Sequence, residues 1–235
     1  VTATLAACGG GSGGGNSSST PSGPVVSNET FQVRTAYNNN LIDTGTVSFK
    51  ASGNYVTGGN SYPVTGSGST TFGALTSSSF GGVPGYSKTT VTTGSVTVNG
   101  STSSLASTGT QYVDLNYVPL GNSGSEYVVV TSANPVPVTA KVNDTGNWYS
   151  ANRYTNSSKT TLLGTRSVSF ALLPDTASTA IMTIITTDKN TQGTTTSTYT
   201  TRSKITPAGV MTRISEQGVE NTSNPTGVLT LDVTF

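Results

Sequence analysis

Short segments in which apolar and polar residues alternate run through most of the chain, from residue 31 to its end at residue 235. Clusters of Gly, Asn and Pro separate these segments at intervals of about 8–14 residues, which is typical of all-β proteins. The last segment, Val228 to Phe235, is the clearest, because Leu229, Leu231, Val233 and Phe235 share one face. We therefore expect an all-β protein, an antiparallel β-sandwich or β-meander.

Individual strands can be placed from this alternation. A strand is predicted at residues 31–37, where Phe31, Val33, Thr35 and Tyr37 alternate with polar residues, and Asn38 to Asn40 is expected to end it. Residues 53–86 are rich in Gly, Ser and Thr and predict short strands with long loops. Residues 179–187 allow a buried helix, but their β-branched side chains favour a strand. Other strands are expected at residues 45–51, 111–118, 126–131, 148–154, 167–172, 194–205 and 210–214.

Two features suggest where the chain turns or divides. Residues 87–98 predict a hairpin that breaks at Gly94 and is closed by Asn99-Gly100, a pair that accepts positive φ at both positions. Asn134-Pro135-Val136-Pro137 cannot complete a strand ladder, so it belongs at an edge or a boundary. It divides the chain into an N-terminal β half (residues 28–133) and a C-terminal β half (residues 134–235), which we expect as two small subdomains or one sandwich.

Composition excludes several kinds of chemistry. The chain has no His and one Cys, so neither a Ser-His-Asp or Cys-His nucleophile nor a zinc site of His and Cys can form. Only 9% of residues are charged and the net charge is +1, which gives no electrostatic basis for binding nucleic acid. We predict no enzymatic activity and no cofactor.

The N-terminus carries the clearest motif. Leu5-Ala6-Ala7-Cys8 holds the only cysteine and is followed at once by a Gly/Ser-rich run. The four residues resemble the lipobox of bacterial lipoproteins, in which an aliphatic residue and two small residues precede the cysteine that receives the lipid. Gly9 after the cysteine resembles the outer-membrane sorting pattern of proteobacterial lipoproteins.

The resemblance implies a membrane anchor. Cys8 would be the lipid attachment site, and residues 8–27 a Gly/Ser-rich tether, a composition that behaves as a flexible coil. Residues 1–7 would be the remnant of a signal peptide whose basic start is missing. The membrane is then the one partner that the sequence predicts, and the bacterial outer membrane, on its periplasmic or surface face, is the expected location.

Two Asp-Thr-Gly triplets, at Asp43 and Asp144, offer an enzymatic alternative. Aspartic proteases place one such triplet in each half of an all-β fold, where the two carboxylates share a proton. The second triplet departs from that pattern at Asn143 and Asn147, and a two-lobed enzyme needs a longer chain. Turns between strands explain both triplets better.

Three further alternatives concern binding and location. Trp148, Tyr149 and Tyr154 would make a carbohydrate platform if exposed, although adjacent residues of a strand point to opposite faces; a core Trp with rim tyrosines is preferred. Asp114, Asn116, Asn143 and Asp144 lack a calcium-loop spacing. The terminal strand resembles that of an outer-membrane barrel, but segments with Thr on both faces argue against one. The expected function is a non-enzymatic binding or structural role on a surface-anchored lipoprotein, with the ligand unknown.

Overall fold

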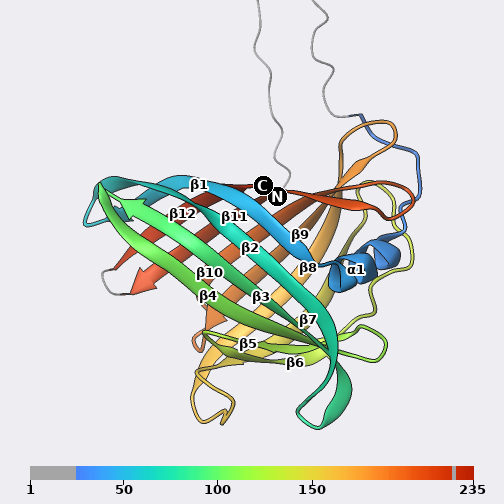
Figure 1. Ribbon diagram of the computed structural model, residues 1–235, viewed down its shortest axis with the longest axis horizontal. Coiled ribbons are helices and arrows are strands. Elements are labelled where there is room, and N and C mark those ends of the chain that lie inside the picture. The colour runs from blue at the N-terminus through green and yellow to red at the C-terminus, as the bar shows by residue number, and fades with distance from the viewer. Residues whose placement is uncertain (1–24, 224–225) are drawn as a thin grey trace, which may run out of the picture.

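The computed structural model describes residues 25–223 and 226–235, and over these residues the chain forms one closed antiparallel β-barrel (Figure 1). Each strand pairs with the next one along the chain, and the first strand pairs with the last. The prediction of an all-β, antiparallel fold is confirmed, whereas the sandwich or open meander is wrong. Alternation specifies two faces for each strand but not which edges meet, and closure removes the two free edges that an open sheet would leave.

Twelve strands make up the described barrel. The first six are β1 Gly45–Thr57, β2 Asn60–Phe80, β3 Val83–Val98, β4 Ser101–Asp114, β5 Pro119–Ser123 and β6 Tyr127–Ala133. The last six are β7 Thr145–Tyr154, β8 Leu162–Pro174, β9 Ala180–Asn190, β10 Thr195–Ile205, β11 Met211–Ser223 and β12 Thr226–Thr234. Residues 28–133 thus supply β1 to β6 and residues 134–235 supply β7 to β12 of a single sheet.

The barrel closes where β1 meets β12, from the pair Lys50 and Thr234 to the pair Thr57 and Gly227. The alternating residues of β12 identified in the sequence face the lumen, because Leu231 and Val233 pair with the inward positions Gly53 and Ala51. The predicted terminal strand is confirmed. Its apolar face lines the interior of the barrel.

Residues 53–86 differ from the prediction, since they form long strands joined by two-residue turns. β2 alone runs for 21 residues, and Gly58-Gly59 and Gly81-Gly82 make the turns at positive φ. Gly94 does not break β3. A Cβ at Gly94 would lie 2.3 Å from the carbonyl oxygen of Ser67, so glycine there permits close approach of β2 and β3. The predicted Asn99-Gly100 turn is confirmed, with φ of 49° and 79°.

The helix α1 (Val33–Ile42) replaces the strand that was predicted at residues 31–37. Its buried residues are Val33, Ala36, Tyr37 and Leu41. Val33 is three residues before Ala36 and four before Tyr37, and Leu41 is four residues after Tyr37, as expected for one face of a helix. The alternation of Val33, Thr35 and Tyr37, which predicts a strand, falls on the first residues of this helix. The Asn residues expected to end a strand lie inside the helix. In contrast, the predicted strand at residues 179–187 is confirmed from Ala180 onward, where β9 begins, in agreement with the β-branched side chains there.

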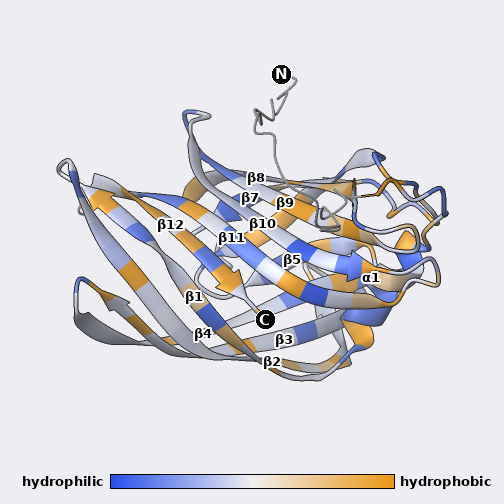
Figure 2. Ribbon diagram, turned by 90° about the horizontal axis from the view of Figure 1, so that it is seen from above, coloured by the Kyte–Doolittle hydropathy of each residue, from blue (hydrophilic) through white to orange (hydrophobic). Residues whose placement is uncertain are grey.

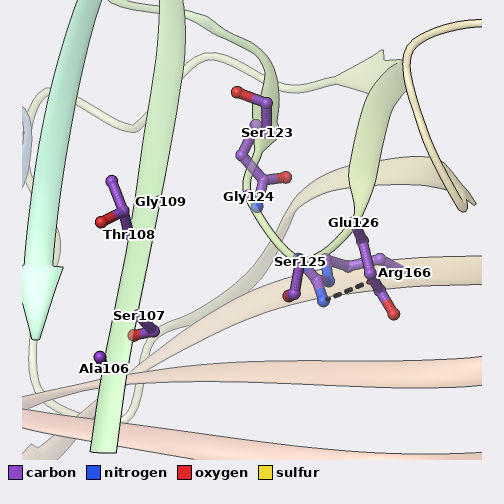
Figure 3. Close-up of a pocket in the computed structure, with 10 residues that line it drawn as sticks. Ala106, Ser107, Thr108, Gly109, Ser123, Gly124, Ser125, Glu126 and Arg166 are labelled. Carbon is purple, nitrogen blue, oxygen red and sulfur yellow. Dashed lines mark ion pairs between the residues drawn. The ribbon is translucent and has the colours of Figure 1, made fainter.

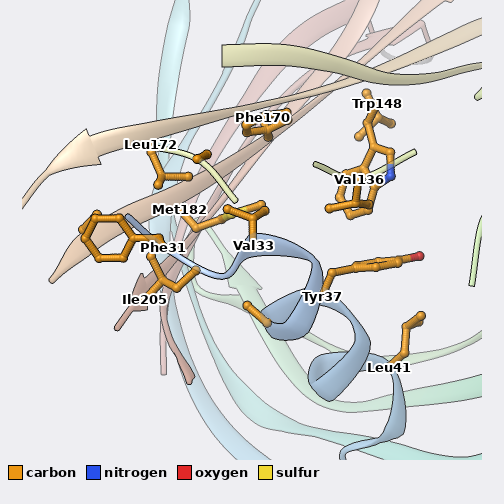
Figure 4. Packing of buried hydrophobic residues seen from close by; sticks show 14 of the residues in the cluster. Phe31, Val33, Tyr37, Leu41, Val136, Trp148, Phe170, Leu172, Met182 and Ile205 are labelled. Atoms are coloured by element: carbon orange, nitrogen blue, oxygen red, sulfur yellow. The ribbon is translucent and has the colours of Figure 1, made fainter. Parts of the chain in front are cut away.

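The helix lies at one end of the barrel, which we call the plugged end (Figure 1). A core of apolar residues fills that end around α1 and Phe31 (Figure 4). Phe31, Leu172 and Ile205 are completely buried there. The β1–β2, β3–β4 and β7–β8 turns lie at the opposite end, which we call the mouth. Because α1 is the only helix in the described residues, no helix covers the mouth.

The outer surface of the barrel is rich in hydroxyl groups. Apolar and polar residues alternate along the strands (Figure 2), and the outward residues of β2 to β4 are mostly Ser and Thr. Hydroxyls on neighbouring strands hydrogen-bond to one another, as in Thr46 with Thr71 at 2.8 Å and Thr97 with Thr102 at 2.8 Å. These cross-strand pairs stabilise the sheet without charged side chains.

Candidate ligand chamber in the barrel lumen

The C-terminus of α1 is fixed to the barrel wall by a buried lysine. Lys88 of β3 donates hydrogen bonds from Nζ to the carbonyl oxygens of Asn40 (2.7 Å) and Asp43 (2.6 Å). The last carbonyls of a helix have no partner within the helix, and a cation there also interacts favourably with the helix dipole. Burial lowers the pKa of Lys88, while Asp43 opposes that change and Arg213 adds to it.

An arginine of β11 links the C-terminal residue Phe235 to Phe72 of β2 at the same end. The guanidinium of Arg213 lies 4.4 Å from the ring centroid of Phe72 and 5.3 Å from that of Phe235. Cations over ring faces are attracted by the ring quadrupole. Burial lowers the pKa of Arg213, with Glu216 and Asp43 opposing the change. Arg213 therefore helps to hold the C-terminal residue beside the closing pair of strands.

Above this plug the lumen contains a chamber of about 450 Å³. Three aromatic side chains lie in its wall, Tyr37 from α1 and Trp148 and Tyr149 from β7. The rings of Tyr37 and Trp148 meet edge to face with centroids 4.6 Å apart, and those of Trp148 and Tyr149 are 6.4 Å apart. Chambers of this size with aromatic walls are typical of small-molecule sites.

The polar groups of the chamber come mainly from amide side chains. Asn40, Gln111 and Asn122 contribute amides and Thr186 contributes a hydroxyl. Glu216 is the only charged residue that lines the chamber, and its Oε1 accepts a hydrogen bond from Thr201 at 3.1 Å. Gln111 is exposed, so water reaches the chamber.

Two polar atoms in the wall lack hydrogen-bond partners among the described residues. They are the Tyr37 hydroxyl and the Trp148 Nε1, both buried, and they lie on the side of the cluster away from Phe31 and Ile205 (Figure 4). Burial raises the pKa of Tyr37 well above its usual value; Tyr149 and Asp114 add to this, whereas the Gln111 side chain opposes it. Gln111 thus approaches this hydroxyl, but without hydrogen-bond geometry.

A β-bulge brings the two aromatic residues of β7 to the same side. Asn147 pairs with Ser169 and Tyr149 pairs with Val168, which leaves Trp148 as the extra residue. The expectation that Trp148 and Tyr149 point to opposite faces is therefore wrong. Trp148 is only 7% exposed, so it belongs to the core as preferred and not to an exposed platform. Tyr154 is separate from both, and its hydroxyl accepts a hydrogen bond from Asn152.

An ion-pair network lines the lumen next to the chamber. Arg166 and Asp188 lie two residues from the chamber residues Val168 and Thr186, so they share the inward face. Arg166 makes a bidentate pair with Asp188, with both contacts at 2.7 Å, and Asp188 is 2% exposed.

A second pair completes this network, which we call the quartet: Glu126, Arg153, Arg166 and Asp188. Arg153 pairs with Glu126 and also reaches Asp188, with Nε 3.5 Å from Oδ2. Hydrogen bonding of the Arg153 guanidinium to the Glu126 carboxylate, which accepts, is the largest of the effects that raise the pKa of Arg153. The two basic and two acidic groups balance one another, so the quartet carries no net charge.

A cleft of about 410 Å³ opens beside the quartet (Figure 3). It is lined by Ser107, Thr108 and Gly109 of β4, by the β5–β6 turn and by Arg166. β5 is short and pairs with β4 only from Thr110 onward. Residues 101–109 of β4 therefore pair with β3 but not with β5. Asn122 lines both this cleft and the chamber, which places the cleft next to the lumen.

The acidic residues singled out in the sequence lie in turns. Asp43 follows α1 and accepts a hydrogen bond from the Thr44 amide, while Asp144 precedes β7 and accepts one from the Lys141 amide. Asp114 accepts from the amides of Asn116 and Val118. Such local bonds fit the turn interpretation of both Asp-Thr-Gly triplets. No cluster of three or more His, Cys, Asp or Glu residues that would suit a metal ion is found in residues 25–223 and 226–235. Cys8 lies outside the described residues.

Sequence reasoning did not identify the chamber or the quartet. One signal was available, because charged residues are rare in this chain and Asp188 follows a run of Ile and Thr within a strand. Alternation places Asp188 on the same face as Met182 and Ile184, which indicates a buried and therefore paired carboxylate. Its partners, however, come from other strands.

No known family model, curated protein or solved structure matches this chain. In the part of the chain that the structure describes, no helix is long and apolar enough to cross a membrane.

Proposed function

We propose that this protein is a non-enzymatic binding protein of the bacterial envelope, which takes a small ligand into the lumen of its barrel. The observation that carries the proposal is the chamber of about 450 Å³, which is lined by three aromatic and three amide side chains above the α1 plug. Strands from both halves of the sequence build this chamber, so a rigid barrel holds its side chains in place.

The surroundings of the chamber favour binding over catalysis. The quartet neutralises its own charges, and the two Asp-Thr-Gly carboxylates accept hydrogen bonds from nearby backbone amides in separate turns. General acid–base catalysis needs a titratable group within hydrogen-bond reach of the substrate. Glu216 is the one carboxylate in the chamber wall, and the other titratable groups there are Tyr37 and Tyr149, whose pKa values burial raises.

The location belongs to the same proposal. The lipobox resemblance at Cys8 supports attachment to the outer membrane by a lipid, and the hydroxyl-rich outer surface of the barrel suits water better than lipid. Replacement Cys8→Ser should move the protein from the membrane fraction to the soluble fraction. Membrane retention of the Cys8→Ser protein would contradict the anchor.

The sole tryptophan provides a direct test of ligand binding, because Trp148 lies in the chamber wall. We expect its emission to change in a saturable way with at least one compound from a panel of sugars, amines, carboxylates and nucleosides. Thr186→Phe should fill the chamber and abolish the response. Thr187→Phe is the matched control, since Thr187 is the next residue of β9 and faces outward. A panel without any saturable response would overturn the proposal.

A further inference from the structure

We infer that the chamber ligand is a small uncharged saccharide, held by amide side chains and stacked on the aromatic wall. The inference rests on the proposed function and names the class of ligand that the chamber recognises. It follows from three properties of the lining, which are its charge, its hydrogen-bonding capacity and its aromatic surface.

The charge of the lining disfavours anions. Glu216 is the only charged residue in the chamber wall. The nearby guanidinium groups of Arg153 and Arg166 are both engaged by carboxylates of the quartet. Arg213 is coupled to Glu216, but it lies over the rings of Phe72 and Phe235 and does not line the chamber. A carboxylate or phosphate ligand would therefore lie beside Glu216 with no cation in the chamber wall to pair with, which costs free energy at low dielectric.

The hydrogen-bonding groups favour hydroxyls over an ammonium. The amides of Asn40, Gln111 and Asn122 each offer two N–H donors and a carbonyl acceptor. An ammonium carries donors only, so it would satisfy Glu216 and leave the amide donors without acceptors. A sugar hydroxyl donates and accepts, and several on one ring can satisfy the amides and Glu216 together.

The aromatic wall supplies a surface for the apolar face of a sugar ring. The half-buried ring of Tyr149 supplies most of this surface, because Trp148 beside it is only 7% exposed and the two rings are inclined by 67°. The Tyr37 hydroxyl and Trp148 Nε1 lie just behind this surface as donors without partners. Gln111 is exposed and its side chain approaches the Tyr37 hydroxyl, so a ligand that displaces this side chain would lie next to that hydroxyl.

The test is a set of titrations that follow the emission of Trp148. The probes are D-glucose, D-galactose, N-acetyl-D-glucosamine and maltose, with tetramethylammonium and acetate as the cationic and anionic comparisons. We expect saturable binding of at least one sugar, with an affinity that does not change between low and high salt, because an uncharged ligand is not screened. We expect no saturable binding of the two ions.

Variants assign the binding to the chamber. Asn122→Ala should weaken sugar binding about tenfold, which corresponds to the loss of a hydrogen bond. Asn152→Ala is the matched control, because Asn152 lies outside the lumen and contacts Tyr154. Glu216→Gln should also weaken binding about tenfold and leave it independent of salt. If the ligand were an organic cation, Glu216→Gln would weaken its binding much more than tenfold, and added salt would weaken its binding to the original protein.

The outcomes separate the two levels of the proposal. Salt-dependent binding of tetramethylammonium, or binding of acetate, with no response to sugars would overturn the saccharide inference and leave the chamber as a binding site. Sugar binding that Thr186→Phe and Asn122→Ala do not affect would place the sugar elsewhere and also overturn the inference. If no compound of the wider panel binds, both proposals fail.

Discussion

At the scale of single residues, Tyr37 shows how the chamber differs from the core around it. Its ring packs against Trp148, but its buried hydroxyl makes no hydrogen bond with the described residues. A buried polar group without a partner costs about 1–3 kcal/mol. A tyrosine that serves only packing would not be expected to keep that hydroxyl, which is consistent with a role in binding.

Tyr37→Phe is therefore expected to leave the free energy of unfolding unchanged or to raise it by about 1 kcal/mol. Urea denaturation of the ligand-free protein measures this difference. Tyr55→Phe provides a comparison, because the Tyr55 hydroxyl pairs with Thr222. A loss of more than about 1 kcal/mol in Tyr37→Phe would show that the hydroxyl has a structural partner.

The same hydroxyl predicts a dependence of stability on pH. The pKa of Tyr37 is raised above the ordinary 10.0 because burial disfavours the charged form. Its contribution to stability is present below pH 10 and is lost as the pH rises through the raised pKa. Above pH 10, the original protein should thus lose stability faster than Tyr37→Phe. Comparing the two proteins isolates the effect of Tyr37, because Lys88 is present in both. Its lowered pKa makes stability rise with pH equally in both, so this effect cancels in the comparison. Parallel curves would contradict the prediction.

Asp188 is the residue on which the quartet depends. It is 2% exposed and receives both contacts of Arg166. Asp188→Asn should lower the free energy of unfolding by about 3 kcal/mol, because it leaves the partly buried Arg166 without its bidentate partner and the quartet with a net positive charge. Asp232→Asn is the control, since Asp232 is exposed and accepts a hydrogen bond from Gln217. Urea denaturation measures both, and equal effects would contradict the assigned role.

At the scale of elements, the plug helix depends on a strand distant from it in sequence. Lys88 donates to two carbonyls at the end of α1, at 2.7 and 2.6 Å. Lys88→Met keeps the aliphatic stem and removes both bonds, so we expect a loss of about 2 kcal/mol and faster hydrogen exchange in α1. Lys50→Met on the exposed face of β1 should have little effect. Unchanged exchange in α1 would refute this account of the plug.

The strands show how far the sequence predicts this fold. Alternation predicts β12, a Thr-rich run after a turn predicts β10, and Asn99-Gly100 predicts a turn, because each of these signals lies within a few neighbouring residues. Closure of the barrel could not be predicted, since β1 and β12 lie at opposite ends of the sequence. The glycine-rich composition of residues 53–86 predicts loops and Gly94 predicts a break, but in the structure Gly68 and Gly94 permit the close approach of β2 and β3.

The candidate site was less predictable than the fold, because its residues also come from parts of the sequence that lie far apart. The chamber combines side chains from α1 and from strands between β4 and β11, and none of them forms a local motif. The bulge at Trp148 changed the face on which an aromatic residue lies, and alternation alone cannot reveal a bulge. The short apolar repeat of α1 was obscured because its first residues also alternate.

At the scale of the whole molecule, the chain enters the barrel at its plugged end. Val25 pairs with Asp175 in the β8–β9 turn, and Phe31 pairs with Ala140. The predicted lipid attachment at Cys8 is only 17 residues before Val25 in the sequence, so a lipid there would tether the barrel from its plugged end. The plugged end would therefore lie close to the membrane, and the mouth would face away from it.

This orientation predicts a difference in reactivity between the two ends of the barrel. Ser101 lies at the mouth, beside the β3–β4 turn, and Ser178 lies in a turn at the plugged end; both are exposed. In the lipid-anchored protein on vesicles, Ser101→Cys should react several times faster than Ser178→Cys with a maleimide on a bulky polymer, because the bilayer obstructs the plugged end. Cleavage of the tether should make the two rates equal. Equal rates on vesicles would mean that the barrel is not held by its plugged end, and the mouth would then have no fixed direction relative to the membrane.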